Sequence, residues 1–124
     1  MACCKVVHTV FGYPVEAVAV QSGHDWNISV YGGCVPHIGS MSIAWLEDYE
    51  IHIETIQRPN HKEAVISDIF AETVAREFKC CATVSCGIHY HNPSKSDIQR
   101  IIDSSLIMLQ ELIYKIRVSQ KNVK

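Results

Sequence analysis

Alternating hydrophobic and polar residues run through the first half of the chain, and this alternation predicts β-strands. In the segment DWNISVY, the hydrophobic residues Trp26, Ile28 and Val30 share one side of an extended chain. Similar runs, several of them rich in β-branched residues, predict five strands in total: residues 5–11, 15–21, 25–31, 40–47 and 50–57. The turn-forming sequence GYP at residues 12–14 separates the first two runs, which predicts that these two strands are antiparallel neighbours.

After these strands the hydrophobic period changes to that of a helix. Between His61 and Phe78 the apolar residues recur at helical spacing. Asn60 stands three residues before Glu63, an arrangement typical of a helix N-cap with a reciprocal glutamate. The pattern therefore predicts a first helix that begins at His61.

A short apolar strand and a long helix complete the predicted order of elements. The segment CCATVSCG, residues 80–87, has the composition of a central strand of the sheet. Ser94 and Asp97 then offer another helix N-cap, followed by one apolar stripe that continues to Ile116. The polar residues 119–124 are expected to form a frayed C-terminal tail.

This order of elements predicts an α+β fold, a two-layer sandwich in which a mostly antiparallel sheet of about six strands carries both helices on one face. The length predicts a single domain over residues 1–118. Ile107 and Met108 lie off the main stripe of the second helix, and we expect Ala44 and Leu46 to give the sheet a second apolar face. This surplus apolar surface favours a homodimer, although crowded packing within one subunit explains it nearly as well.

The composition narrows the class of protein. Of 124 residues, 48% are hydrophobic and 19% are charged, as in a globular protein. A formal net charge of -2 gives no electrostatic reason to expect nucleic acid or an anionic membrane as a partner. No apolar run approaches the roughly 20 residues that span a bilayer, and the N-terminal segment lacks the features of a signal peptide, so we expect a cytoplasmic protein.

Three clusters of polar residues stand at the ends of predicted elements, where backbone groups are free to meet a ligand. The first is the loop YGGCVPHIGSMS, residues 31–42, which joins two predicted strands. Its glycines let the backbone approach a ligand closely, Ser40 adds a hydroxyl donor, and His37 adds a ring that stacks or donates. The loop is compatible with a phosphate, although it matches neither a Walker motif nor a dinucleotide-binding fingerprint.

The second cluster, Asn60-His61-Lys62, lies at the predicted first turn of helix one. A helix N-terminus carries free N–H groups and partial positive charge, so an ammonium there is unfavourable unless an anion is close. This placement indicates a bound phosphate or carboxylate, and the alternative is that Lys62 simply points to solvent.

The third cluster, GIHYH, begins at Gly87, where the predicted central strand ends. His89 and His91 face the same side of an extended segment and could bind a metal, with His37 or His61 as a third ligand. No acidic residue is placed nearby to orient such a ligand, and histidines at strand ends often bond only to the backbone.

The six cysteines indicate reduced thiols rather than a disulfide framework. Cys3-Cys4 and Cys80-Cys81 are adjacent pairs, which are poor material for closing loops, and the chain has no CxxC pair for a zinc ribbon. Cys34 lies near His37 in the glycine loop, so a thiolate site is conceivable, with a structural cysteine as the plainer alternative.

Taken in order, these clusters resemble a known family. The motifs GGxxPHIGxxS, HK at the start of a helix, GIHxxN after a strand and DI in a second helix are similar to those of the small D subunit of gallate decarboxylase and its relatives, the prenylated-flavin chaperone family. The resemblance covers roughly residues 26–112. The chain departs from the family pattern at Asn60, where a glycine is expected, and at Ala64, where an acidic residue is expected.

The resemblance implies a non-catalytic homodimer, related in fold to proteasome assembly chaperones, that binds prenylated FMN or FMN and supports maturation of a UbiD-type decarboxylase. Carried over position by position, it assigns three walls of a flavin site to Gly33, Pro36, His37, Gly39 and Ser40, to His61 and Lys62, and to Gly87 and His89. From their chemistry, Ser40, Lys62 and the amides of helix one are hypothesised to bind the phosphate, with His37 and His89 at the ring system.

Two other classes of function remain as alternatives. One is a small histidine-rich enzyme that performs metal-assisted or thiol chemistry on a phosphorylated small molecule. The other is an assembly factor of the same fold that binds no ligand.

Overall fold

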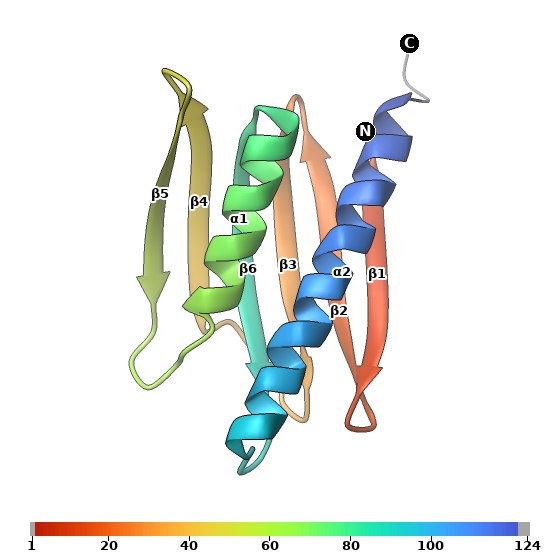
Figure 1. The fold of residues 1–124 in the computed structure, drawn as a ribbon, viewed down its shortest axis with the longest axis vertical. Coiled ribbons are helices and arrows are strands. Elements are labelled where there is room, and N and C mark those ends of the chain that lie inside the picture. Colours follow the sequence, from red (N-terminus) through yellow and green to blue (C-terminus); the bar gives the residue numbers. More distant parts are fainter. Residues whose placement is uncertain (1, 122–124) are drawn as a thin grey trace.

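The structure, a computed structural model, describes residues 2–121. It contains a six-stranded sheet and two helices, which confirms the predicted α+β class (Figure 1). The elements follow in the order β1 (Cys3–Val10), β2 (Tyr13–Ser22), β3 (Asp25–Gly33), β4 (Ser40–Glu47), β5 (Glu50–Gln57), α1 (Ala64–Phe78), β6 (Cys81–His89) and α2 (Lys95–Lys121).

The strands lie in the order β1-β2-β3-β6-β4-β5. Strand β6 is parallel to β3 and antiparallel to β4, and all other neighbours are antiparallel. The predicted central position of this strand is therefore confirmed. Because β6 separates β3 from β4, the loop that joins those two strands must cross the end of β6.

The first hairpin confirms that β1 and β2 are antiparallel neighbours, with Val10 paired to Tyr13. Its turn is Phe11-Gly12, with φ of 50° and 81°, so both central residues are left-handed. A two-residue turn of this kind matches the twist of the flanking strands. Tyr13 and Pro14, predicted as part of the turn, belong to β2 instead.

The core lies between one face of the sheet and the two helices, which lie side by side across it (Figure 1). The strands contribute small residues such as Ala17, Ala19 and Ala82, all fully buried. The helices fill the space above them with large side chains, among them Phe70 and Leu112. Small residues facing large ones give the dense packing of a protein interior, and each large side chain contributes about 2 kcal/mol.

Helix α1 begins at Ala64, so the predicted start at His61 is wrong. Asn60 has a φ of 63°, which places it in a left-handed turn outside the helix. Glu63 occupies the N-cap position but makes no side-chain capping bond, and the Ala64 amide donates instead to Gln57 Oε1 at 3.1 Å. The segment before the helix is therefore a turn, which leaves the side chain of Glu63 free for another contact.

Helix α2 has the predicted cap. The Asp97 amide donates to Ser94 Oγ at 3.1 Å, and the Ser94 amide donates to Asp97 Oδ2 at 3.0 Å. The helix continues through Lys121, so residues 119–121 are helical rather than part of a frayed tail. Ser119 donates to the Ile116 carbonyl at 2.7 Å within this last turn. The remaining predicted tail residues, 122–124, lie outside the described residues.

Neither described helix is both long and apolar enough to cross a membrane.

Candidate functional site

Three segments that are distant in sequence meet where β3 and β6 end, at the lower end of Figure 1. They are the β3–β4 loop (residues 34–39), the segment before α1 (residues 58–63) and the last residues of β6. Each carries one of the three predicted polar clusters. The parallel pairing of β3 with β6 brings these clusters together, because Gly33 lies opposite His89.

Backbone hydrogen bonds hold the β3–β4 loop against the end of β6. The amides of Cys34 and Gly39 donate to the carbonyls of His89 and Cys86, at 2.7 and 2.8 Å. The His37 amide is 3.4 Å from the Gly87 carbonyl. These loop amides therefore bond within the chain and do not form an open anion-binding concavity.

The glycines allow this close approach. A Cβ at Gly87 would lie 1.6 Å from the His37 carbonyl oxygen, and one at Gly33 would lie 2.3 Å from the His89 carbonyl oxygen. Both distances are far below van der Waals contact, so any side chain would push the loop away from β6. These glycines shape the site by letting two backbones touch.

The loop, the segment before α1 and the end of β6 line a shallow, open pocket of about 300 Å³. Its lining contains three of the predicted site residues, His37, His61 and His89, together with Val35 and Arg58. The His37 ring centroid lies 5.0 Å from that of His61 and 6.3 Å from that of His89. Three imidazoles, one aliphatic side chain and one guanidinium thus surround a single small space.

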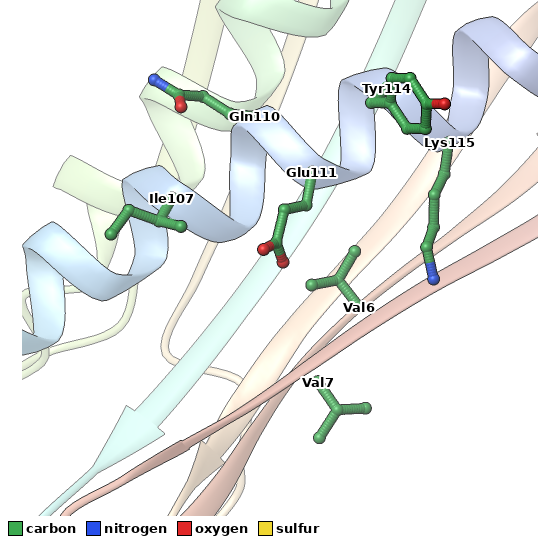
Figure 2. A pocket seen from close by; sticks show the side chains of 7 residues that line it. All are labelled: Val6, Val7, Ile107, Gln110, Glu111, Tyr114 and Lys115. Atoms are coloured by element: carbon green, nitrogen blue, oxygen red, sulfur yellow. The ribbon is translucent and has the colours of Figure 1, made fainter.

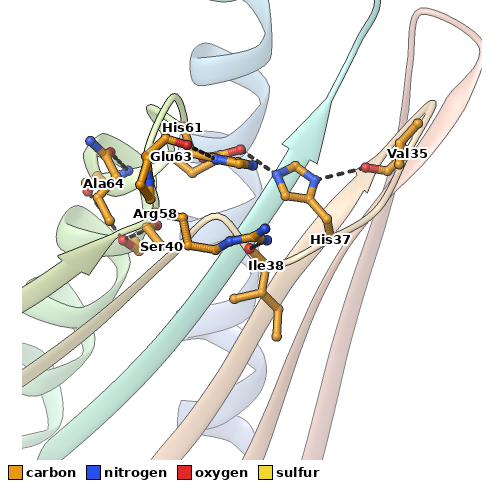
Figure 3. A network of polar contacts seen from close by, with 11 residues as sticks. Val35, His37, Ile38, Ser40, Arg58, His61, Glu63 and Ala64 are labelled. Atoms are coloured by element: carbon orange, nitrogen blue, oxygen red, sulfur yellow. Dashed lines mark hydrogen bonds and ion pairs between the residues drawn. The ribbon is translucent and has the colours of Figure 1, made fainter.

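His37 is held by both of its ring nitrogens (Figure 3). Nδ1 lies 3.0 Å from the Val35 carbonyl oxygen, and Nε2 lies 2.8 Å from Glu63 Oε1. Glu63 is only 9% exposed. A Cβ at Gly39 would lie 2.2 Å from Glu63 Oε2, so this glycine leaves the room that the carboxylate occupies.

The other predicted site residues lie around this pocket without lining it. Ser40 is 2% exposed, and its hydroxyl lies 2.9 Å from Ser67 Oγ in the core between β4 and α1. Pro36 is exposed in the loop, and Lys62 is exposed beside His61. The hydroxyl of Ser40 therefore points away from any ligand in the pocket.

Three residues of the site, Val35, Arg58 and Glu63, were not among the predicted site residues. Arg58 lines the pocket and donates from a guanidinium nitrogen to the Ile38 carbonyl at 2.7 Å. Its signal was a basic residue directly after a predicted strand and close to His61 and Lys62. Glu63 was interpreted as a cap, and nothing in the sequence indicates that its side chain bonds to His37.

The geometry bears on the thiol and metal chemistry of the enzymatic alternative. Both nitrogens of His37 bond elsewhere, so it does not activate the Cys34 thiol. Burial, and then the nearby Glu63 carboxylate, raise the pKa of the Cys86 thiol well above its usual range. Within residues 2–121, no group of three or more His, Cys, Asp and Glu side chains is arranged to hold a metal ion.

A larger hollow of about 550 Å³ lies between α2 and β1 and contains none of the predicted site residues (Figure 2). Glu111 and Lys115 extend from α2 toward β1. Glu111 lies 2.7 Å from His8 Nε2, and Lys115 donates to the Lys5 carbonyl at 2.7 Å. The charged groups that line this hollow thus connect α2 to the edge strand β1 by polar contacts.

The fold is similar to that of a solved assembly chaperone. The chain is similar to a chain of a chaperone complex for yeast 20S proteasome assembly, with a TM-score of 0.53 over 95% of this chain and 98% of that chain. The sequence identity is 12%, so this likeness concerns the fold.

The sequence itself defines the family more narrowly. Residues 9–117 match the family model described as the prenylated flavin chaperone LpdD-like domain, so the chain belongs to this family. It is also 30% identical over 92 residues to Protein LpdD of Lactiplantibacillus plantarum, a match that spans 70% of this chain and 65% of LpdD. The family resemblance drawn from the motifs is confirmed, and the family is one of chaperones rather than enzymes.

Proposed function

We propose that this protein is a non-catalytic chaperone that binds prenylated FMN, or FMN, and supports the maturation of a UbiD-type decarboxylase in the cytoplasm. The observation that carries the proposal is the pocket of three imidazoles with Arg58 and Val35, which lies inside the matched family domain. Planar rings favour stacking with a planar ligand, and a guanidinium favours a phosphate.

The residues at this pocket fit the parts of a prenylated flavin. The rings of His37, His61 and His89 would flank the ring system, and Val35 would contact the apolar ring that prenylation adds. Arg58 and the exposed Lys62 would hold the phosphate, in place of the Ser40 hydroxyl, which bonds to Ser67. Gly33, Pro36, Gly39 and Gly87 would act through the shape of the loop.

Anaerobic titration of the purified protein with FMN and prenylated FMN, followed by absorbance and calorimetry, tests the proposal. One flavin should bind per subunit. The double substitution His61→Ala with His89→Ala should weaken binding at least tenfold, because two of the three rings are lost. His24→Ala is the matched control, since His24 lies at the opposite end of β3 and contacts Lys79. Failure of the wild type to bind either flavin would contradict the proposal.

Transfer of the flavin to a UbiD-type decarboxylase tests which protein the chaperone serves. Val35 and Ile38 are exposed apolar side chains in the site loop, so the partner should cover them during delivery of the flavin. Flavin-loaded protein should activate an apo form of a UbiD-type decarboxylase faster than free prenylated FMN does. Ile38→Ser should slow activation while it leaves flavin affinity within twofold. Equal rates with and without the protein would argue against a delivery role.

We propose further that two copies associate through the sheet face that the helices leave open. Met41 and Ile56, paired across β4 and β5 on this face, are 48% and 74% exposed. Six strands of about eight residues cover roughly 750 Å², close to the about 800 Å² per partner of a standard interface. Sedimentation should give a dimer for the wild type and a monomer for Met41→Glu. Tyr114→Glu, on the 66% exposed Tyr114 of α2, is the control and should remain dimeric.

A further inference from the structure

The contacts of His37 determine where its protons lie. A backbone carbonyl only accepts hydrogen bonds, so Nδ1 carries a proton and donates it to Val35. Nε2 faces a carboxylate oxygen at 2.8 Å, and this second contact also requires a proton between the two atoms. With Glu63 ionised, His37 is therefore an imidazolium that donates from both nitrogens.

The position of Glu63 is costly unless it has this partner. The side chain is 10% exposed, and its second oxygen, Oε2, is buried without a hydrogen-bond partner among the described residues. A buried carboxyl group is either neutral or paired with a cation, and His37 is the partner that residues 2–121 supply for the ionised form. The guanidinium of Arg58, which also lines the pocket, donates to the Ile38 carbonyl.

This arrangement limits how His37 can contact a ligand. Both nitrogens are engaged, so it offers neither a lone pair to a metal nor a hydrogen bond to a flavin. What remains for the pocket is the flat ring itself, fixed in orientation at two points and carrying positive charge. A cation beside a π-system is attracted most strongly when that system is electron-rich.

We propose that Glu63 is a positioning residue that holds His37 as a fixed imidazolium wall, and that this wall makes the site prefer reduced, electron-rich flavin over oxidised flavin. The inference about ligand preference rests on the proposed flavin-binding function. The inference about the protons of His37 does not, because it concerns only groups of this chain.

The chain offers a sharp pair of variants. In Glu63→Gln the amide can still bond to Nε2 but donates to it, so His37 keeps its position and loses its charge. In Glu63→Ala the ring loses its charge and the contact at Nε2, and it keeps only the hydrogen bond to the Val35 carbonyl. The matched control is Glu111→Gln, because Glu111 makes a 2.7 Å contact with His8 at the α2–β1 edge, away from the pocket.

Two measurements test the proposal. Nitrogen-15 NMR at pH 7 should find two protonated ring nitrogens on His37 in the wild type and only Nδ1 protonated in Glu63→Gln. Anaerobic titration with oxidised FMN and with dithionite-reduced FMN should find that Glu63→Gln weakens binding of the reduced form by about tenfold. Binding of the oxidised form should change less than twofold. Glu63→Ala should weaken both, and Glu111→Gln neither.

Each outcome decides one part of the inference. If wild-type His37 carries a proton on one nitrogen only, the role assigned to Glu63 is wrong. If both nitrogens are protonated but Glu63→Gln weakens the two flavin forms equally, the redox preference is wrong. If neither form of FMN binds the wild type, the flavin preference falls together with the proposed function, while the NMR result still decides the pairing of Glu63 with His37.

Discussion

The two helices begin with similar sequences and different structures. Asn60-x-x-Glu63 precedes α1 and Ser94-x-x-Asp97 precedes α2, and both predict reciprocal caps. At α2 the two capping bonds form. At α1 neither forms, and the acidic side chain turns away from the helix to bond to His37.

The difference shows that a side chain used in the candidate site is no longer available to cap its own helix. A glutamate at this position would ordinarily satisfy free amides at its own helix end. Here its carboxylate bonds to His37 of the β3–β4 loop, and the Ala64 amide donates to Gln57 instead. We therefore expect the start of α1 to respond to changes in distant segments, and the start of α2 to respond only to changes in its own residues.

The strongest test of this contrast is Gly87→Ala. The added Cβ would lie 1.6 Å from the His37 carbonyl oxygen, so the loop must move away from β6 and Glu63 loses its partner. We expect a loss of about 3 kcal/mol in the free energy of unfolding, measured with urea. Ser85→Ala on the same strand is the control, since Ser85 makes only a 3.5 Å contact with Ser29. If Gly87→Ala lost no more free energy of unfolding than Ser85→Ala, the proposed coupling between β6 and α1 would be wrong.

Gly39→Ala should have the next largest effect, about 2 kcal/mol, because its Cβ would displace the flexible Glu63 carboxylate rather than backbone. Cys86 reports this displacement. Its raised pKa keeps the thiol protonated and unreactive, and both causes, burial and the Glu63 charge, weaken when the carboxylate moves. Iodoacetamide at pH 8 should then label Cys86 faster than in the wild type, where exposed Cys3 reacts first. Unchanged protection of Cys86 would mean that Glu63 has stayed in place.

Much of the fold could be predicted because each element carries its own pattern. Alternation located the strands, and β4 and β5 have the predicted bounds of residues 40–47 and 50–57. The insertion of β6 between β3 and β4 could not be predicted, because pairing between distant strands depends on the packed faces rather than on any local signal. This insertion explains the glycine-rich loop, which has to cross the end of β6.

The site was predicted only in part, because the ends of elements can be predicted from the sequence and the packing between elements cannot. His37, His61 and His89 stood out as polar residues at the ends of elements, and they do meet. The role given to Ser40 does not match its buried bond to Ser67, because its place in the core is set by the packing of α1 on β4. The capping motif gave the wrong role for Glu63, although the same kind of motif is correct at α2. A sequence pattern does not reveal whether the carboxylate bonds to the amides of its own helix or to His37.

Substitutions of Asn60 test whether this residue caps α1. If Asn60 were a cap, threonine would replace it at little cost. In this structure Asn60 has a φ of 63°, where a β-branched residue is strongly disfavoured. Asn60→Thr should therefore lose about 1.5 kcal/mol in urea unfolding. Asn60→Gly, which suits a left-handed residue, should stay within about 0.5 kcal/mol of the wild type. Tolerance of threonine would restore the capping interpretation of α1.

The smallest effect on the free energy of unfolding is expected at the start of α2, where the predicted cap is present. Ser94→Ala removes the hydroxyl that accepts from the Asp97 amide, so the free energy of unfolding should fall by about 1 kcal/mol. Ser94→Thr keeps an equivalent oxygen and should remain within about 0.5 kcal/mol of the wild type. Because this cap touches only its own helix, Ser94→Ala should leave flavin affinity and the protection of Cys86 unchanged. If Ser94→Ala exposed Cys86 as Gly39→Ala is expected to, the two helix ends would be coupled, and the diversion of Glu63 to the site would no longer distinguish them.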